Sequence, residues 1–242
     1  MTSQAAIWHD VECAAYDIDL PLWRSLAASA AGPVLDVGAG TGRVAIDLAL
    51  HGYEVTALDA DPDLLDELGA RARKRNLHVP TVTGDARSFE LGREYALVIA
   101  PMQVVQLFDG ERGRRAALAC IRRHLRLGGV FAAALADPFE GIPEGDVVPP
   151  MPDIRDVDGW VYASTPVDVR IENGTAAIDR HRQSVSPAGE IDEWMFTIEI
   201  DLVAPDQLEA EAAACGFRVR ERGWIPETVD WTGSTVVIVE AA

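Results

Sequence analysis

The sequence predicts an α/β protein, in which a doubly wound, mostly parallel sheet carries a smaller antiparallel sheet as an insertion. Residues 34 to 135 alternate short apolar runs with longer amphipathic stretches, as successive β–α units do. From residue 160 to 203, apolar and polar side chains instead alternate one by one, which is typical of antiparallel strands. A length of 242 residues suits one domain with such an insertion.

The first half supplies the parallel strands and the helices between them. We expect strands at Val34–Val37, Glu54–Asp59, Val79–Thr83, Ala96–Pro101 and Val130–Ala136. We expect helices near Gly42–His51, Pro62–Arg75 and Glu111–Leu125, preceded by one at Val11–Ala30. Asp61 and Pro62 are typical of a helix N-terminus, and Gly128 is expected to end the third of these helices.

The second half is expected to be mainly antiparallel. A Pro-, Gly- and acid-rich loop begins near residue 138, and Asn173-Gly174 is a strong hairpin signal between two predicted strands. The strands are expected at Trp160–Ser164, Val167–Glu172, Ala176–Val185 and Ile191–Val203. A helix at 205–215 and strands at 217–224 and 235–240 follow. The predicted organisation is a helical cap (1–33), a core (34–137 with 204–242) and an inserted β lid over the substrate region (138–203).

The stretch VLDVGAGTGR places Gly38, Gly40 and Gly42 directly after the first strand. Glycines cost backbone entropy, so such a cluster needs φ > 0 or a molecule pressed against bare backbone. Asp59 ends the second strand about 20 residues later, where an acid can accept hydrogen bonds from ribose hydroxyls. We therefore expect an adenosine-type ligand at the carboxyl edge of the sheet, against the alternative of a tight turn without a ligand.

The glycine spacing separates two cofactor classes. Dinucleotide sites carry G-x-G-x-x-G, whereas this chain has G-x-G-x-G with Arg43 at the position of the third glycine. Asp36 stands two residues before the first glycine, where it would repel a diphosphate but suits a ligand with an ammonium group.

These segments resemble the class I S-adenosylmethionine-dependent methyltransferases. VLDVGAGTGR is similar to their first motif, VTALDADPDLL to the second and VTGDARSF to the third, while LRLGGVFAAAL resembles their turn into the fifth strand. The resemblance implies a Rossmann-like, doubly wound seven-stranded sheet that is mostly parallel, with an antiparallel last strand and an inserted antiparallel β lid. It also implies S-adenosylmethionine as cofactor.

The resemblance assigns most of the cofactor residues. Asp59 would bind the ribose, Asp85 the adenine amino group and Ala86 a ring nitrogen through its backbone. Arg24 is a candidate for the donor's carboxylate, against the alternative of a surface arginine. The predicted cofactor site comprises Arg24, Asp36, Gly38, Ala39, Gly40, Asp59, Ala60, Asp85, Ala86, Pro101 and Gln103.

The acceptor is expected to be a small molecule rather than a nucleic acid. The chain has a formal charge of −18, and the 22 acidic and 7 basic residues from Asp137 onward would repel phosphate backbones. Ala100-Pro101-Met102-Gln103 also lacks the aromatic residue of base-methylating relatives and has Ala100 at the first position, where they carry an amide or an acid. The inserted sheet resembles small-molecule methyltransferases that act on glycine or on antibiotic sugars.

Two residues are predicted to act in catalysis and two to bind substrate. Tyr16 lies where related enzymes place a tyrosine over the sulfonium, although helix packing is an equal reading. His181 is the predicted base on the inserted sheet, with His9 as a second candidate, although alternation also allows a surface position for His181. Gln106 and Trp194 are predicted to contact the substrate, although sheet packing is the alternative for Trp194.

Other features of the sequence bear on the cellular compartment, metals, the membrane and partners. The three cysteines lack C-x-x-C spacing and favour free thiols in the cytoplasm, and the histidines lack metal-ligand spacing, so no metal is predicted. No run is long enough to predict a membrane span, and the inserted sheet is a candidate surface for a homodimer. Transfer of methyl to N or O of a metabolite is the leading hypothesis; a non-catalytic sensor or partner subunit, and a peptide methyltransferase, are the alternatives.

Overall fold

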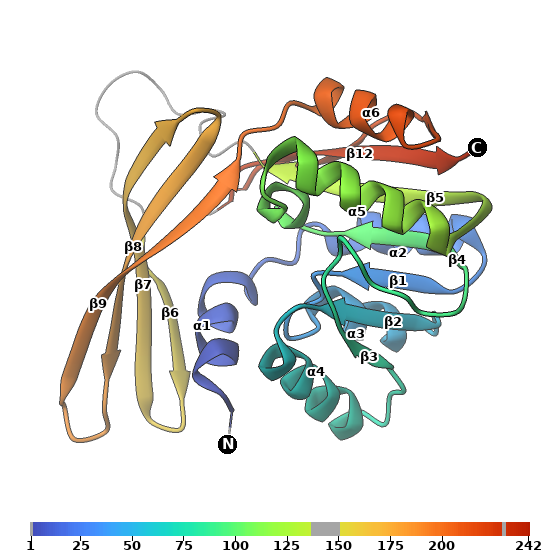
Figure 1. The fold of residues 1–242 in the computed structure, drawn as a ribbon. Helices are drawn as coiled ribbons and strands as arrows, with labels where there is room; N and C mark the ends of the chain where they lie inside the picture. The colour runs from blue at the N-terminus through green and yellow to red at the C-terminus, as the bar shows by residue number, and fades with distance from the viewer. Residues whose placement is uncertain (1, 137–150, 229–230) are drawn as a thin grey trace.

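The computed structural model describes residues 2–136, 151–228 and 231–242, and the fold class predicted from the sequence is confirmed (Figure 1). The helices are α1 (Gln4–Cys13), α2 (Leu20–Ala30), α3 (Arg43–Leu50), α4 (Pro62–Lys74), α5 (Gly110–His124), α6 (Pro205–Ala214) and the short 3-10 helix η1 (Val104–Leu107). The core strands are β1 (Val34–Val37), β2 (Val55–Asp59), β3 (Thr81–Thr83), β4 (Tyr95–Ala100), β5 (Leu125–Ala136), β10 (Phe217–Val219), β11 (Gly223–Ile225) and β12 (Ser234–Ala241). The inserted strands are β6 (Asp153–Val157), β7 (Trp160–Glu172), β8 (Thr175–Val185) and β9 (Ile191–Asp201).

The central sheet runs in the order β10-β12-β5-β4-β1-β2-β3, with β11 paired to the edge of β12. The strands from β3 to β5 are parallel, whereas β12 lies antiparallel to β5 over seven residue pairs. The order reverses between β1 and β4, and open α/β sheets bind ligands beside such a switch point, at the carboxyl ends of the strands.

Two apolar layers sandwich this sheet. One joins it to α5 and α6 through residues such as Leu118 and Leu208, and the other joins it to α2, α3 and α4 through residues such as Trp23 and Leu68. Strand β5 shows the alternation, since Phe131 belongs to the first layer and Ala132 to the second. Burial on both faces explains why these strands read as continuous apolar runs. Among the described residues, no helix is long and apolar enough to cross a membrane.

The antiparallel sheet β6-β7-β8-β9 stands beside the core, with α1 between the two (Figure 1). The face that carries Phe196 and Ile198 is turned toward α1 and the core, as the alternation in this strand predicts. Helix α1 contributes Ile7, Trp8 and Val11 to a small apolar cluster with Tyr162 of β7. This helix therefore joins the inserted sheet to the core.

Four details of the elements differ from the sequence predictions. The single helix expected over residues 11–30 is two helices, because Pro21 fits only the first turn of a new helix. Gly128 does not end α5, which stops at His124; it lies at φ +73° within β5. The strands expected at 160–164 and 167–172 form one strand, with a register shift at Pro166, and β6 was not anticipated. The predicted loop at 138–153 lies almost wholly outside the described residues.

Gln106 anchors both ends of the insertion. Its side-chain amide donates to the carbonyls of Ala136 and Asp201 at 3.0 and 2.9 Å, and its carbonyl accepts from the Ala136 amide at 2.9 Å. Ala136 is the last residue of β5 and Asp201 the last of β9, so one buried amide ties together the points where the chain leaves and re-enters the core.

The glycine turn between β1 and α3 is tight for a reason internal to the chain. Gly38, Gly40 and Gly42 all adopt positive φ. A Cβ at Gly38 would meet Val104 at 2.6 Å, and a Cβ at Gly40 would meet the His9 ring at 2.3 Å. Protein side chains therefore already require glycine at these positions, and the expected approach of a ligand to the backbone at Gly38 and Gly40 stays a prediction.

Replacement of Gln106 tests the anchor. Gln106→Leu leaves the Ala136 amide and two carbonyls without their partner, and each unsatisfied buried group costs about 1–3 kcal/mol. We expect urea denaturation to show a loss of at least about 2 kcal/mol in the free energy of unfolding. Gln103→Leu, three residues earlier, should change it by less than about 0.5 kcal/mol. Equal losses would contradict the anchoring role.

The packing of His9 on Gly40 is open to a double-mutant cycle. Gly40→Ala should destabilise more than Gly52→Ala, because both glycines have positive φ but a Cβ at Gly52 meets nothing within 4 Å. The excess should be about 1–3 kcal/mol of overpacking. His9→Ala in the Gly40→Ala background should recover part of it in thermal unfolding. Additive effects would mean that the ring and the turn are uncoupled.

Candidate functional site

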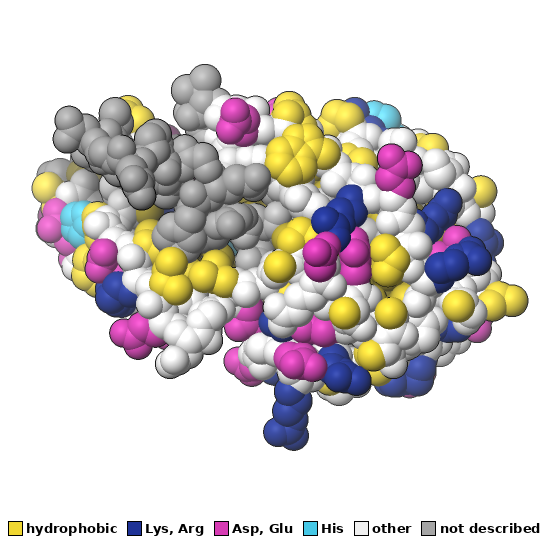
Figure 2. Space-filling view, turned by 90° about the horizontal axis from the view of Figure 1, so that it is seen from above, with side chains coloured by type: hydrophobic (Ala, Val, Ile, Leu, Met, Phe, Trp, Pro, Cys, Tyr) yellow, Lys and Arg dark blue, Asp and Glu magenta, His cyan; other side chains and the backbone are white. Residues whose placement is uncertain are grey.

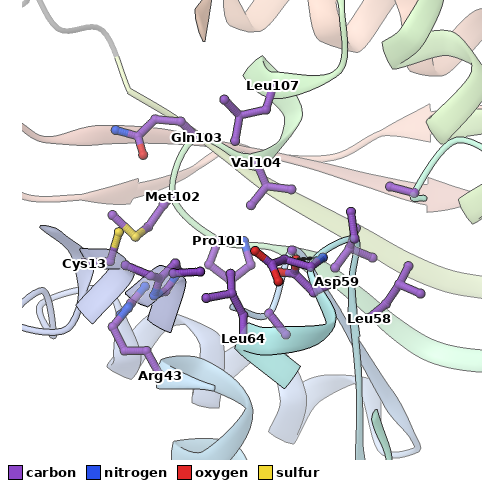
Figure 3. A pocket seen from close by; sticks show the side chains of 18 of the residues that line it. Cys13, Arg43, Leu58, Asp59, Leu64, Pro101, Met102, Gln103, Val104 and Leu107 are labelled. Carbon is purple, nitrogen blue, oxygen red and sulfur yellow. Dashed lines mark hydrogen bonds between the residues drawn. The ribbon is translucent and has the colours of Figure 1, made fainter. Parts of the chain in front are cut away.

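A cavity of about 770 Å³ opens at the carboxyl ends of β1, β2 and β4. Its wall on the core side includes Asp36 to Ala39, Leu58 to Asp61 and Pro101 to Val104. Figure 3 shows Leu58 and Asp59 at one end of the cavity and Cys13, Met102 and Gln103 at the other. Helix α1 and strands β8 and β9 supply the opposite wall, which includes Trp8, Glu12, Arg182, Phe196 and Ile198.

Asp59 connects the glycine turn after β1 to the turn after β2. One carboxylate oxygen accepts from the Gly40 amide at 2.7 Å, and the other accepts from the Asp61 amide at 3.0 Å. A carboxylate offers about four lone-pair positions. Asp59 therefore shapes the turn and still has acceptor capacity for two further donors, such as a pair of vicinal hydroxyls.

Asp36 is a buried acid with little around it to balance its charge. Its side chain is fully buried in the cavity wall, and neither oxygen has a hydrogen-bond partner of normal geometry among the described residues. Burial raises the pKa of Asp36 to about 8, while nearby Arg43 and the approach of the Ala45 amide oppose this rise. Such a carboxyl is a site for a group that brings positive charge.

The third motif reaches the cavity in a different way from that expected. Asp85 and Ala86 both line it, and their predicted contacts with the adenine stay a prediction. The Asp85 carboxylate, however, is held by the Arg87 guanidinium at 2.7 Å, which keeps its pKa below the usual value, and Arg87 also pairs with Asp109 at 2.8 Å. Any contact of Asp85 with a ligand is therefore made by a carboxylate that is already ion-paired.

The other predicted cofactor residues divide into two groups. Gly38, Ala39, Ala60, Pro101 and Gln103 line the cavity. Gly40 does not, because His9 covers it. Arg24 is also outside the lining, since its guanidinium forms a two-point ion pair with Asp47 of α3 at 2.8 and 3.0 Å. The predicted contact between Arg24 and the donor's carboxylate is corrected accordingly.

The four predicted catalytic and substrate residues lie outside the cavity lining. Tyr16 is buried between Trp231 and the Arg43 guanidinium. His181 is on the exposed side of β8, 3.6 Å from Glu193, and Gln106 is occupied as the anchor described above. Trp194 packs edge-on against Trp8, with ring centroids 5.0 Å apart. Packing, which was the alternative reading for Tyr16 and Trp194, is what the structure shows.

Sequence reasoning missed most of α1 and the residues that face it. Trp8 and Glu12 line the cavity from α1, and Arg182 lines it from β8. Arg182 forms two hydrogen bonds with Glu12, at 2.9 and 3.0 Å, and its guanidinium stacks 3.6 Å above the Phe196 ring. Ser3 caps α1, and a helix expected to start at Ser3 rather than at Val11 would have placed Trp8 and Glu12 one turn apart on a common face.

The wall on the core side fits S-adenosylmethionine. The unpartnered Asp36 suits the ammonium of its amino-acid part, Asp59 has acceptors left for the ribose hydroxyls, and Ala86 and Pro101 offer apolar wall to the adenine. This set combines an acid for an ammonium with an acid for a sugar, which a dinucleotide diphosphate does not require.

Comparisons with known proteins place the chain. Residues 34–129 match the family model described as "Methyltransferase domain". A glycine/sarcosine N-methyltransferase of Parasynechococcus marenigrum is 29% identical over 74% of this chain and 62% of its own length, so this chain spans less than two thirds of that relative. A dTDP-3-amino-3,4,6-trideoxy-α-D-glucopyranose N,N-dimethyltransferase of Streptomyces venezuelae is 28% identical over 78% of this chain and 76% of its own.

A solved structure shares the whole arrangement. The S-adenosylmethionine-bound amino pentose methyltransferase CalS10 of Micromonospora echinaspora has a TM-score of 0.72 at 20% identity, covering 98% of this chain and 97% of its own. At that identity the likeness concerns the fold, including the antiparallel sheet beside the core. Together with the family match, it shows that residues 34–129 carry a methyltransferase domain and that the fold of this domain, with the antiparallel sheet beside it, is shared with that structure.

Proposed function

We propose that this protein transfers a methyl group from S-adenosylmethionine to a nitrogen atom of a small molecule, with oxygen as the less favoured acceptor. The observation that carries the proposal is the two-sided cavity. One wall fits the donor, and the facing wall is made by the insertion and α1 and is enclosed by Trp8, Phe196 and Ile198. Both curated relatives described above are named as N-methyltransferases of small molecules.

Methyl transfer requires little from the protein beyond positioning of the two reactants and exclusion of water from the space between them. When bound, S-adenosylmethionine supplies an electrophilic methyl group. Asp59 and Asp36 would hold the donor, and the apolar wall from the inserted sheet would exclude water from the space in front of it. A charged amine must lose a proton before its nitrogen has a lone pair to share, so a proton acceptor in the cavity wall is also needed.

The size and lining of the cavity favour a small acceptor over a polymer. The donor occupies part of the 770 Å³, and the remainder suits a compact metabolite. On the face shown in Figure 2, acidic and basic side chains are interspersed among the described residues instead of forming a basic surface for nucleic acid.

The direct test uses donor labelled in its methyl group. Incubation with fractionated metabolites should transfer label to a low-molecular-weight amine, detected by mass spectrometry. Asp59→Ala should reduce transfer at least 100-fold by removing the ribose acceptors and loosening the Gly40 turn, whereas Arg24→Ala should reduce it less than threefold. Label that remains in the protein or peptide fraction, or an Arg24 variant as impaired as the Asp59 variant, would overturn the proposal.

The raised pKa of Asp36 predicts a proton linked to cofactor binding. Because this pKa is about 8, the carboxyl is mostly protonated at pH 6.5 in the free protein, and an arriving ammonium favours its ionised form. Binding of S-adenosylhomocysteine should release close to one proton at pH 6.5 and fewer above pH 8, so affinity should rise with pH by at most about tenfold per unit. Calorimetry in two buffers of different ionisation enthalpy measures the release.

Asp36→Asn provides the control for that experiment. The amide cannot ionise, so the variant should bind S-adenosylhomocysteine without proton release and with an affinity that is flat between pH 6 and 8. A release in the variant equal to that of the unmodified protein would assign the proton to another group.

A further inference from the structure

We propose that His9 is the catalytic base, with the Nε2 lone pair of its imidazole accepting the proton of the acceptor nitrogen. The inference rests on the proposed function, and it names a residue on α1 where the sequence favoured His181 on the inserted sheet. Four sets of contacts support it.

The first is position. The His9 ring lies over the glycine turn, and the point where a Cβ of Gly40 would stand is 2.3 Å from Nε2. The residue lines the same cavity as Asp36 and Asp59. Its imidazole therefore lies in the cavity wall, packed on the glycine turn beside the two carboxyls that fit the donor.

The second is the tautomer. The Thr41 hydroxyl donates its single proton to the Asp10 carboxylate at 2.7 Å, and the same oxygen lies 3.3 Å from His9 Nδ1. Asp10 accepts from Thr41 because it is ionised: burial raises its pKa, but the Arg71 and Thr41 hydrogen bonds outweigh burial and leave it below the usual value. The Thr41 oxygen is thus an acceptor toward His9, so Nδ1 carries the hydrogen and the lone pair of the ring is on Nε2.

The third is the protonation state of the ring. Burial is the main cause that lowers the pKa of His9 below 6.5, so the imidazole is neutral at pH 7. The charged groups around it come from four elements and act in opposite directions. Asp10 of α1 and Asp59 of β2 raise the pKa, whereas Arg71 of α4 and Arg43 of α3 lower it.

The fourth is that the other titratable groups of the cavity are committed elsewhere. Glu12 is held by Arg182, Arg180 and Ser164, and Asp85 by Arg87. Burial raises the pKa of the Cys13 thiol to about 12, so it stays protonated. Asp61 caps α4 by accepting from the Asp63 amide at 2.9 Å. With Asp36 and Asp59 assigned to the donor, the described groups that keep a free acceptor are His9 and the second oxygen of Asp61, and of these two His9 is the one packed on the glycine turn.

The proton step balances without a further reactant. The N–H bond of the acceptor ammonium breaks, its electron pair stays on nitrogen as the lone pair that attacks, and the proton bonds to Nε2. The resulting imidazolium returns its proton to water once the site opens. The Thr41–Asp10 pair stabilises this cation through Nδ1–H, and Arg71 keeps Asp10 in place.

The test uses two ligands that differ at the reacting position. S-adenosylhomocysteine has no group there, whereas sinefungin carries an amine on the carbon that replaces the sulfonium and its methyl. A base at this point should accept a hydrogen bond from that amine. His9→Phe should therefore weaken sinefungin about tenfold and S-adenosylhomocysteine less than twofold in calorimetry, and His9→Gln, which retains an acceptor oxygen, should recover part of the sinefungin affinity.

A measurement on the unmodified protein covers the case in which a His9 variant fails to fold. In protein labelled with ¹⁵N-histidine, the His9 signals at pH 7.5 should report the Nδ1–H tautomer and an Nε2 shift that moves with sinefungin. Thr41→Val should disturb this tautomer, and Thr41→Ser should preserve it.

Three outcomes would overturn the inference. An Nε2–H tautomer in the unmodified protein would remove the lone pair, and equal weakening of both ligands in His9→Phe would reduce His9 to a shape-filling role. Failure of the unmodified protein to bind either ligand would overturn the proposed function itself. The first two results leave that function standing, because S-adenosylhomocysteine would still bind.

Discussion

The carboxylate of Asp10 is the contact on which the arrangement of the site depends. This residue of α1 is 4% exposed, and it accepts from Thr41 in the glycine turn and from Arg71 of α4, while Arg155 of β6 approaches one oxygen at 3.2 Å. A buried carboxylate is costly unless it is paired and hydrogen-bonded on several sides, and removal of one partner is worse than absence of the whole set. Two residues further along α1, and so on another side of the helix, Glu12 repeats the pattern with Arg180, Arg182 and Ser164. Helix α1 is therefore fixed by charge to the core on one side and to the inserted sheet on the other.

This division explains which half of the site the sequence predicts well. The wall of the cavity on the core side consists of short local segments at strand ends, where Gly38, Asp59 and Asp85 are placed by a β–α repeat with a regular spacing. The opposite wall, made by α1 and the inserted sheet, depends on contacts between residues far apart in the chain, such as Glu12 with Arg182, which are 170 residues apart. Periodicity carries no information about such pairs. Position on the inserted sheet favours His181 and Trp194, but strand alternation does not say which neighbour covers which face. A helix predicted to begin at Val11 also leaves out most of α1, the neighbour that packs on this sheet.

Some correct expectations had a different cause from the one supposed. The glycines of the turn do lie beside the donor wall, yet Gly40 must be glycine because His9 packs where its Cβ would be, and Gly42 because Leu68 does. Likewise Asp59 does end β2 in the cavity, but it holds the Gly40 and Asp61 amides before any ligand arrives. A glycine that is required for contact with a cofactor and a glycine that is required for packing within the protein look the same in a sequence. At Gly40 the requirement that the structure shows is packing against the His9 ring.

Burial of the Asp36 charge lowers the stability of the free protein, and a cationic ligand that compensates this charge would gain binding affinity from it. The pKa of Asp36 is near 8 when folded and near 4 when unfolded, so between these values the folded protein holds a proton that the unfolded chain has lost. The folded state therefore loses stability relative to the unfolded state as pH rises through this window, and this carboxyl destabilises the free protein most above pH 8. A ligand ammonium placed beside Asp36 compensates the buried charge and reverses the penalty. An acid with a full set of protein partners, such as Asp10, has no such energy to release. The contrast between these two buried acids, one fully paired and one without a hydrogen-bond partner of normal geometry among the described residues, separates a residue that holds the fold from one that is suited to a cationic ligand.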